Sequence, residues 1–142
     1  MLESLTLQEK LELQALLAER IRRDNQRKWL TYYPDEGPLR RELYPKHMQF
    51  FADGAHYQQR LFMAANRVGK TEGVGAYEVA LHLTGNYPAW WNGRRFDRKT
   101  KGWAAGDTRQ TVRDILVEKL LGPKNARGTG MIPGESIVRI VP

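Results

Sequence analysis

The chain has 142 residues, of which 41% are hydrophobic and 27% charged, as is typical of one soluble globular domain with its own core. It has no cysteine, which excludes disulfides and thiolate metal sites and fits a reducing compartment. The sequence has no apolar run of about 18 residues and no basic-then-apolar leader, so we expect neither a membrane span nor export. The net charge of +7 favours a polyanion such as nucleic acid as partner.

The first predicted element is one long helix over residues 6–31. Thr6 and Glu9 have the spacing of a capping box at its start. Apolar residues recur at helical spacing and form a broad stripe, which we expect to pack on the chain's own domain. The stripe consists of Leu7, Leu11, Leu13, Leu16, Leu17 and Ile21.

Two basic clusters account for most of the charge surplus. Each cluster has two interpretations, an ordinary solvated surface or a contact with a nucleic-acid backbone. The first comprises Arg20, Arg22, Arg23, Arg27 and Lys28, and the second comprises Arg94, Arg95, Arg98, Lys99 and Lys101.

Prolines and a glycine within residues 32–38 indicate a linker. Pro45 suits the first turn of a helix, so a second, short helix is predicted from Pro45 to about Asp53 and Gly54. Its apolar side chains would face the core.

The next segment, residues 64–71, has the sequence Ala-Ala-Asn-Arg-Val-Gly-Lys-Thr. It joins a predicted core strand over residues 60–65 to a predicted helix that starts at Lys70 and ends near residue 83. Gly-Lys-Thr in that setting is the core of a phosphate-binding loop, although Ala64 replaces the first glycine of the usual pattern. An ordinary strand–turn–helix junction is the alternative.

The chemistry of such a loop assigns a role to each part of this segment. Main-chain amides and the helix N-terminus form a partly positive pocket for phosphates. Lys70 would neutralise the β and γ phosphates of ATP, and the Thr71 hydroxyl would coordinate Mg²⁺. The candidate nucleotide-binding residues are Ala65, Asn66, Arg67, Val68, Gly69, Lys70 and Thr71.

Beyond this segment we predict a short strand over residues 102–106, a helix over 107–121, a loop over 122–134 and a strand over 136–141. Strands alternating with helices predict an α/β protein, a partial P-loop NTPase layered fold whose mostly parallel sheet is flanked by helices and preceded by the long N-terminal helix. Three strands are few for such a sheet, so we expect an incomplete domain.

Nucleotide hydrolysis requires a carboxylate at the end of a neighbouring strand, often followed by a catalytic glutamate. The nearest match is Asp107, which follows a glycine and precedes a threonine. A helix cap explains Asp107 better. We therefore expect the chain to bind nucleotide but to lack hydrolytic activity on its own.

Four segments resemble the ATPase domain of large terminase subunits of tailed bacteriophages, and Asn-Arg-x-Gly-Lys-Thr is their most specific part. The segments are residues 44–51, 60–71, 83–91 and 103–107. The resemblance implies an N-terminal helix and linker over residues 1–40. Residues 41–142 would be the N-terminal part of the ATPase domain, without its metal-binding acidic motif and without the nuclease domain.

The resemblance also implies a function in viral genome packaging. Proteins of this family couple hydrolysis of ATP, with Mg²⁺, to translocation of double-stranded DNA into a capsid. They form a homo-oligomeric ring on the portal protein and work with a small terminase subunit in the host bacterial cytoplasm, without a membrane.

Three residues acquire candidate roles from this resemblance. Arg67 matches a loop arginine that acts on the γ-phosphate in this family, which makes it the candidate catalytic residue. Gln49 and His47 both fall where a glutamine reads the adenine edge. The alternatives are an arginine that anchors the loop and a solvent-facing helix position.

Three further functions stay open on sequence alone. They are another P-loop DNA translocase or helicase, a truncated non-catalytic remnant that binds DNA or a partner, and a small-molecule kinase. We expect Trp90 and Trp91 to be packed in the interior rather than to contact DNA.

Overall fold

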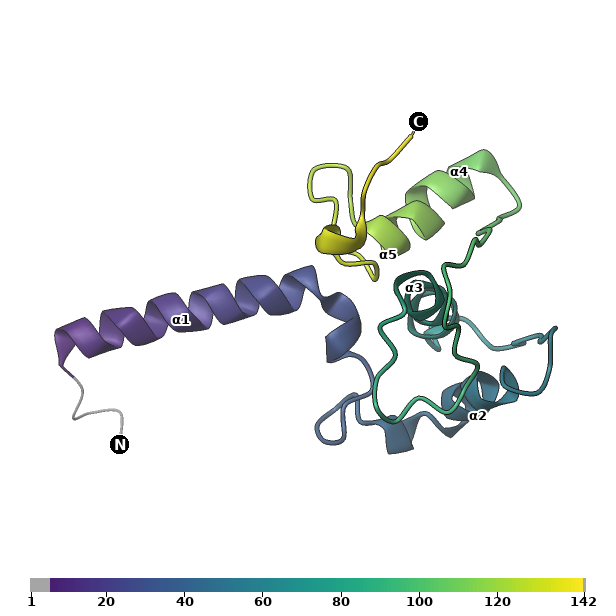
Figure 1. Ribbon diagram of the computed structural model, residues 1–142, viewed down its shortest axis with the longest axis horizontal. Helices are drawn as coiled ribbons and strands as arrows, with labels where there is room; N and C mark the ends of the chain where they lie inside the picture. The colour runs from purple at the N-terminus through teal and green to yellow at the C-terminus, as the bar shows by residue number, and fades with distance from the viewer. Residues whose placement is uncertain (1–5, 142) are drawn as a thin grey trace.

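The computed structural model describes residues 6–141, except the side chains of residues 23–26. It consists of helices joined by irregular segments (Figure 1). The four-residue or longer elements, in chain order, are α1 (Leu7–Gln26), η1 (Lys28–Thr31), α2 (Pro45–Asp53), η3 (Lys70–Ala76), α3 (Tyr77–Thr84), η4 (Val112–Leu116) and α5 (Val117–Leu121). Three-residue turns complete them at η2 (Arg41–Leu43), α4 (Arg109–Thr111) and η5 (Gly134–Ser136).

The long helix α1 projects away from the rest of the chain (Figure 1). The predicted capping box is confirmed, because the Thr6 amide donates to Glu9 Oε2 at 2.8 Å and the Glu9 amide donates to Thr6 Oγ1 at 3.3 Å. The expectation that the apolar stripe packs on the chain's own domain is wrong. Leu16, for example, is 69% exposed.

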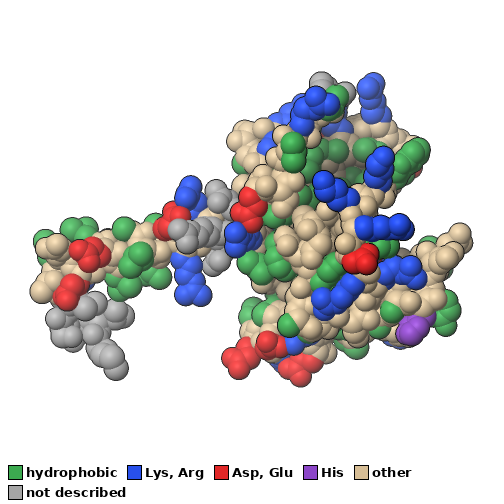
Figure 2. Space-filling view, in the orientation of Figure 1, with side chains coloured by type: hydrophobic (Ala, Val, Ile, Leu, Met, Phe, Trp, Pro, Cys, Tyr) green, Lys and Arg blue, Asp and Glu red, His purple; other side chains and the backbone are tan. Residues whose placement is uncertain are grey.

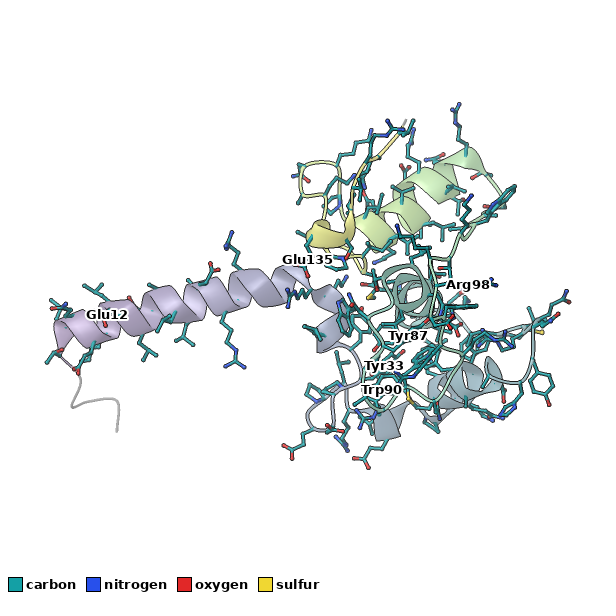
Figure 3. The ribbon with its side chains drawn as sticks, in the orientation of Figure 1. Glu12, Tyr33, Tyr87, Trp90, Arg98 and Glu135 are labelled. Carbon is teal, nitrogen blue, oxygen red and sulfur yellow. The ribbon has the colours of Figure 1, made fainter. Side chains whose placement is uncertain are left out.

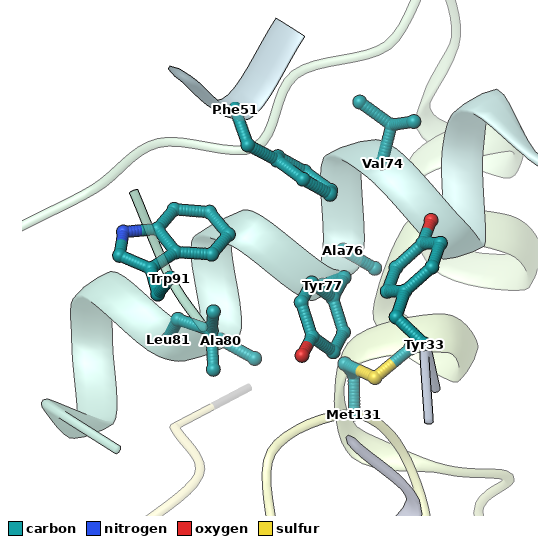
Figure 4. Packing of buried hydrophobic residues seen from close by; sticks show 9 residues of the cluster. All are labelled: Tyr33, Phe51, Val74, Ala76, Tyr77, Ala80, Leu81, Trp91 and Met131. Atoms are coloured by element: carbon teal, nitrogen blue, oxygen red, sulfur yellow. The ribbon is translucent and has the colours of Figure 1, made fainter. Parts of the chain in front are cut away.

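The core is built from aromatic side chains packed against α3. Tyr33 meets Tyr77 edge-to-face with ring centroids 5.1 Å apart, and Phe51 lies 4.8 Å from Trp91. Figure 4 shows these four rings grouped around the helix with Leu81. Such rings bury much apolar area and favour tilted or edge-to-face contacts. The predicted burial of Trp91 is therefore confirmed, and Trp90 is half-buried against the same cluster.

The predicted helices over 45–54 and 70–83 are present, as is helical structure over most of 107–121. In the last of these, α4, η4 and α5 follow one another without a break. Its cap is Thr108, whose hydroxyl accepts a hydrogen bond from the Thr111 amide at 3.1 Å. The expectation that Asp107 is the cap is therefore wrong by one residue. The predicted loop after α5 is irregular, as expected.

The predicted α/β fold with a mostly parallel sheet is wrong. Residues 60–65, 102–106 and 137–141 have no regular secondary structure, and the described residues 6–141 contain no β-strand. Within that range the one β-pairing is an isolated antiparallel bridge between Thr129 and Pro133. Trp103 is 97% exposed and Val138 99% exposed, so the second and third of these segments are not packed as core strands. Aromatic residues around α3 form the interior in place of a sheet.

Candidate functional site

The 64–71 segment lies at the start of the helical stretch formed by η3 and α3. Gly69 precedes the first helical residue and has φ 78°, a left-handed conformation that glycine adopts without steric cost. The Gly73 and Val74 amides both donate to the Gly69 carbonyl, at 2.7 and 3.1 Å. Amides in the first turn of a helix have no acceptor within the helix. Those of Lys70, Thr71 and Glu72 therefore form a partly positive end that suits an anion.

Lys70 is folded back over this turn. Its Nζ atom donates hydrogen bonds to the carbonyls of Ala64 and Ala65, at 3.0 and 3.3 Å. The ammonium group is therefore held at the two carbonyls that precede the turn. Ala65 and Asn66 are exposed on the same turn, and Thr71 is exposed just beyond it.

The start of the segment is anchored by Arg60, which has a largely buried ion pair with Glu78 of α3. Arg60 Nη2 lies 3.0 Å from both carboxylate oxygens of Glu78. The same guanidinium donates to the Phe50 carbonyl at 2.5 Å and stacks 4.3 Å over the Phe50 ring. These contacts fix the chain to α2 and α3 before it enters the turn.

A cavity of about 560 Å³ opens beside the turn. Its volume is in the range of small-ligand sites in proteins. Its walls come from the linker, the start of α2 and the 64–71 segment. The lining residues include Tyr32, Tyr33, Leu43, Tyr44, His47, Arg67, Val68 and Gly69.

Backbone strain is concentrated at this cavity. Among the described residues, the non-glycine residues with positive φ are Tyr33, at 56°, and Arg67, at 63°, and both line it. Such conformations cost about 1 to 3 kcal/mol each and cluster at functional sites. The strain therefore supports a functional interpretation of the cavity.

The structure separates the two residues proposed to read a nucleobase. Gln49 is exposed on α2, where Lys46 Nζ lies 3.5 Å from its Oε1, and it does not line the cavity. His47 lines the cavity but is buried, with Nε2 3.0 Å from the Val68 carbonyl and Nδ1 2.8 Å from the Tyr33 hydroxyl. Burial lowers the pKa of His47. Both ring nitrogens thus bond to protein groups.

Sequence reasoning missed Tyr33, which it placed in a linker. Its side chain reaches the interior next to Trp90 (Figure 3), where its hydroxyl donates to the Gly73 carbonyl at 2.7 Å. The sequence feature that could have indicated a buried Tyr33 is the pair of consecutive tyrosines before a proline. Aromatic residues in a polar linker indicate packing, but not the residue on which they pack.

Glu72 joins three parts of the chain at the far wall of the cavity. It is paired with Lys28 after α1 and with Lys119 of α5, whose Nζ lies 2.6 Å from Glu72 Oε2. Burial by itself raises the pKa of Glu72, but hydrogen bonds from Lys119, Lys28 and Tyr32 outweigh this and lower it to about 2. The carboxylate is therefore ionised at neutral pH and links η1 and α5 to η3.

We expect Glu72→Gln to remove an acid-sensitive part of the stability. Because the folded-state pKa of about 2 lies below the ordinary value of 4.5, this contribution is complete above about pH 4.5 and is lost as pH falls toward 2. We expect a loss of about 1 to 2 kcal/mol near neutral pH, after allowing for solvent screening. Urea unfolding at several pH values measures it.

The matched control is Glu42→Gln, which removes a carboxylate whose ion pair with Arg40 is exposed. We expect a change below about 0.5 kcal/mol, as for most surface pairs. Equal effects of the two variants, or a Glu72 effect that persists unchanged at pH values near 2, would contradict the assignment.

The two basic clusters differ in how far their charges are already paired. In the first, Arg22 is paired with Glu19 at 2.8 Å, and Arg27 is paired with Glu135 beside the end of α1 at 3.0 Å (Figure 3). Lys28 is engaged by Glu72. The Arg23 side chain lies outside the described residues.

In the second cluster, Arg94 donates to the Gly54 carbonyl at 3.3 Å, and Arg95 donates to the Trp91 carbonyl at 3.1 Å. Arg98, Lys99 and Lys101 are exposed and have no ion pair within the part of the chain that the structure describes. Figure 2 shows Lys and Arg side chains gathered over this face of the helical body.

Between residues 6 and 141, as far as the side chains are described, there is no group of three His, Asp or Glu residues that could hold a metal ion. Thr71 remains the candidate Mg²⁺ ligand on sequence grounds. No helix in the described part of the chain is long and apolar enough to cross a membrane.

The chain is similar to the large terminase subunit of Salmonella phage P22. The two are 33% identical in an alignment 152 positions long, which covers 96% of this chain and 28% of the phage protein. The chain is thus terminase-like and spans less than a third of the length of that relative. No family model matches the chain. No solved structure matches it.

Proposed function

We propose that the chain is the nucleoside-triphosphate-binding part of a phage DNA-packaging protein, with residues 64–71 as the phosphate site. The observation that carries the proposal is the placement of Gly69, Lys70 and Thr71. Gly69 forms the left-handed turn, Lys70 holds its ammonium beside the loop carbonyls, and the helix amides follow directly. A phosphate chain would replace those carbonyls as the acceptor of the Lys70 hydrogen bonds.

In this proposal Mg²⁺ is bound with the nucleotide, and Thr71 supplies one oxygen ligand. Arg67 is exposed at the cavity mouth and bears a forked cation that suits the γ-phosphate. The aromatic cavity beside the turn takes the base and sugar, with Tyr44 stacked on His47 at a centroid distance of 5.2 Å. Tyr44 then offers a ring face to the base.

The proposal includes contact with double-stranded DNA through Arg98, Lys99 and Lys101. These three side chains are exposed and can neutralise DNA backbone phosphates without recognising a base sequence. A protein that moves along DNA requires such sequence-independent binding. Coupling of ATP hydrolysis to translocation, with the portal protein and a small terminase subunit as partners, belongs to the whole packaging protein in this proposal.

Titration calorimetry with a non-hydrolysable ATP analogue tests the nucleotide site. We expect saturable binding at one site per chain, with an affinity that falls when Mg²⁺ is chelated. Inorganic triphosphate should compete for the same site. Absence of binding at millimolar nucleotide, in a folded sample, would overturn the proposal.

A further inference from the structure

We propose that Tyr33 and His47 form a positioning pair that holds the turn at Gly69 in the 64–71 segment from both of its sides. The inference rests on the proposed function for its biological meaning, since it describes how that site is held. Tyr33 is 3% exposed and His47 is 6% exposed, and they lie 40 and 26 residues before Gly73 in the sequence. Neither belongs to the Gly-Lys-Thr motif.

The pair brackets the turn. On one side, His47 Nε2 lies 3.0 Å from the carbonyl of Val68, the residue before Gly69. On the other side, the Tyr33 hydroxyl donates to the carbonyl of Gly73 at 2.7 Å, one turn into the helix. The two side chains bond to each other at 2.8 Å. Movement of either end of the turn therefore breaks a buried hydrogen bond.

The glycines of the segment fit this pair closely. A Cβ atom at Gly73 would lie 2.9 Å from the Tyr33 hydroxyl, and one at Gly69 would lie 3.4 Å from His47 Cε1. Glycine inside a helix costs roughly 1 kcal/mol relative to alanine. Close approach of the Tyr33 hydroxyl gives a physical reason for glycine at position 73.

The number of protons available to the hydrogen bonds among Tyr33, His47, Val68 and Gly73 depends on the charge of His47. His47 must donate from Nε2 to the Val68 carbonyl, so Nδ1 of the neutral ring is an acceptor. Tyr33 has one hydroxyl proton, and it faces two acceptors, Nδ1 and the Gly73 carbonyl. A neutral His47 therefore leaves one contact without a proton, whereas a protonated His47 completes all three. Burial nevertheless lowers the pKa of His47, so the folded turn favours the neutral ring and protonation should loosen the network.

Other groups near His47 define what else could respond to pH. Its neighbours are the rings of Tyr33, Tyr44 and Phe62. The cavity that His47 lines also contains the charged groups of Lys46, Arg67 and Glu72. Of these, Glu72 has a pKa of about 2 and keeps its charge above pH 5. Glu72 therefore does not account for a change in protection between pH 7.5 and 5.

Hydrogen exchange of the nucleotide-free chain tests the proposal with Tyr33→Phe. The Gly73 and Val74 amides, which both donate to the Gly69 carbonyl, report on opening of the turn. We expect them to exchange roughly tenfold faster in Tyr33→Phe, the loss that corresponds to about one net hydrogen bond. In the wild type their protection should fall as pH drops below about 6.5, because a histidine whose pKa is lowered by burial takes up its proton more readily when the turn opens.

Tyr87→Phe is the matched control, because the Tyr87 hydroxyl bonds to His82 Nδ1 at 3.0 Å at a separate place. It removes the same chemical contact from a tyrosine–histidine pair. We expect wild-type exchange and wild-type pH dependence at Gly73 and Val74 in this variant. Equal protection in Tyr33→Phe and the wild type, or the same loss at all amides of the chain, would overturn the proposal.

A double-mutant cycle of Tyr33→Phe with Gly73→Ala, measured by urea unfolding, supplies an independent test. Alanine at position 73 should be strongly destabilising in the wild type because of the Tyr33 hydroxyl. The loss in free energy of unfolding caused by Gly73→Ala should be clearly smaller in the Tyr33→Phe background, where that oxygen is absent. Additive effects of the two substitutions on the free energy of unfolding would contradict a direct contact between the Tyr33 hydroxyl and position 73. The exchange and unfolding experiments use no nucleotide. They therefore test the Tyr33–His47 pair even if calorimetry detects no nucleotide binding.

Discussion

Replacement of Lys70 by alanine is expected to weaken binding of the Mg²⁺–ATP analogue roughly 100-fold, because two charge-assisted hydrogen bonds of about 1.5 kcal/mol each are lost. The Lys70 ammonium bonds to the carbonyls of Ala64 and Ala65 and makes no ion pair within the described part of the chain. We therefore expect the unfolding midpoint to change little. Calorimetry gives the affinity, and thermal unfolding gives the stability.

Lys46→Ala is the matched control for charge. Lys46 also lines the cavity, but its Nζ atom lies near Gln49 on α2 rather than at the turn. We expect its affinity for the analogue to fall no more than a few-fold. Equal affinities in Lys70→Ala and the wild type would rule out a role for Lys70 in binding phosphate, and equal losses in both lysine variants would indicate general charge attraction.

Leu81→Ala is expected to lower the free energy of unfolding by about 3 to 4 kcal/mol, because it removes a fully buried side chain and leaves a cavity. Leu81 is 0% exposed in α3, where the aromatic core surrounds it. Since small domains have a total stability of roughly 5 to 15 kcal/mol, this is a large fraction. Urea unfolding measures the difference.

The same substitution in α1 serves as the control. Leu16 is exposed, so Leu16→Ala should change the free energy of unfolding by less than about 0.5 kcal/mol, and alanine is a good helix former. A loss at Leu16 as large as that at Leu81 would show that the apolar stripe of α1 is buried in solution. The account of a core centred on α3 would then be wrong.

The helices could be predicted because their signals are local. Thr6 and Glu9 satisfy each other within one turn, and Pro45 fixes the first turn of α2. The prediction of a sheet was wrong, because a strand requires a partner far away in the sequence and local patterns do not show whether that partner exists. Short apolar runs such as residues 61–63 are ambiguous on this point. Here Leu61 and Met63 are exposed, and the adjoining Arg60 is held by Glu78 instead.

The sequence predicted the residues of the phosphate-loop motif, but not the distant side chains that hold the motif in place. Gly69, Lys70 and Thr71 are adjacent in the sequence, so the pattern identifies them together. Tyr33 and His47 are 14 residues apart, and Tyr33 is 40 residues from Gly73, so no local pattern joins them. The same holds for Glu72, whose partners Lys28 and Lys119 come from opposite ends of the chain. Long-range contacts of this kind are decided by packing rather than by local spacing.

The central claim is that the turn around Gly69 binds the phosphates of a nucleotide. The most direct measurement is a map of backbone amide chemical shifts in the isotope-labelled chain as the Mg²⁺–ATP analogue is added. We predict that the largest shifts fall on Gly69, Lys70 and Thr71 and that they saturate together. Saturating shifts that leave this turn unchanged, or shifts confined to the basic residues 98–101, would contradict the claim.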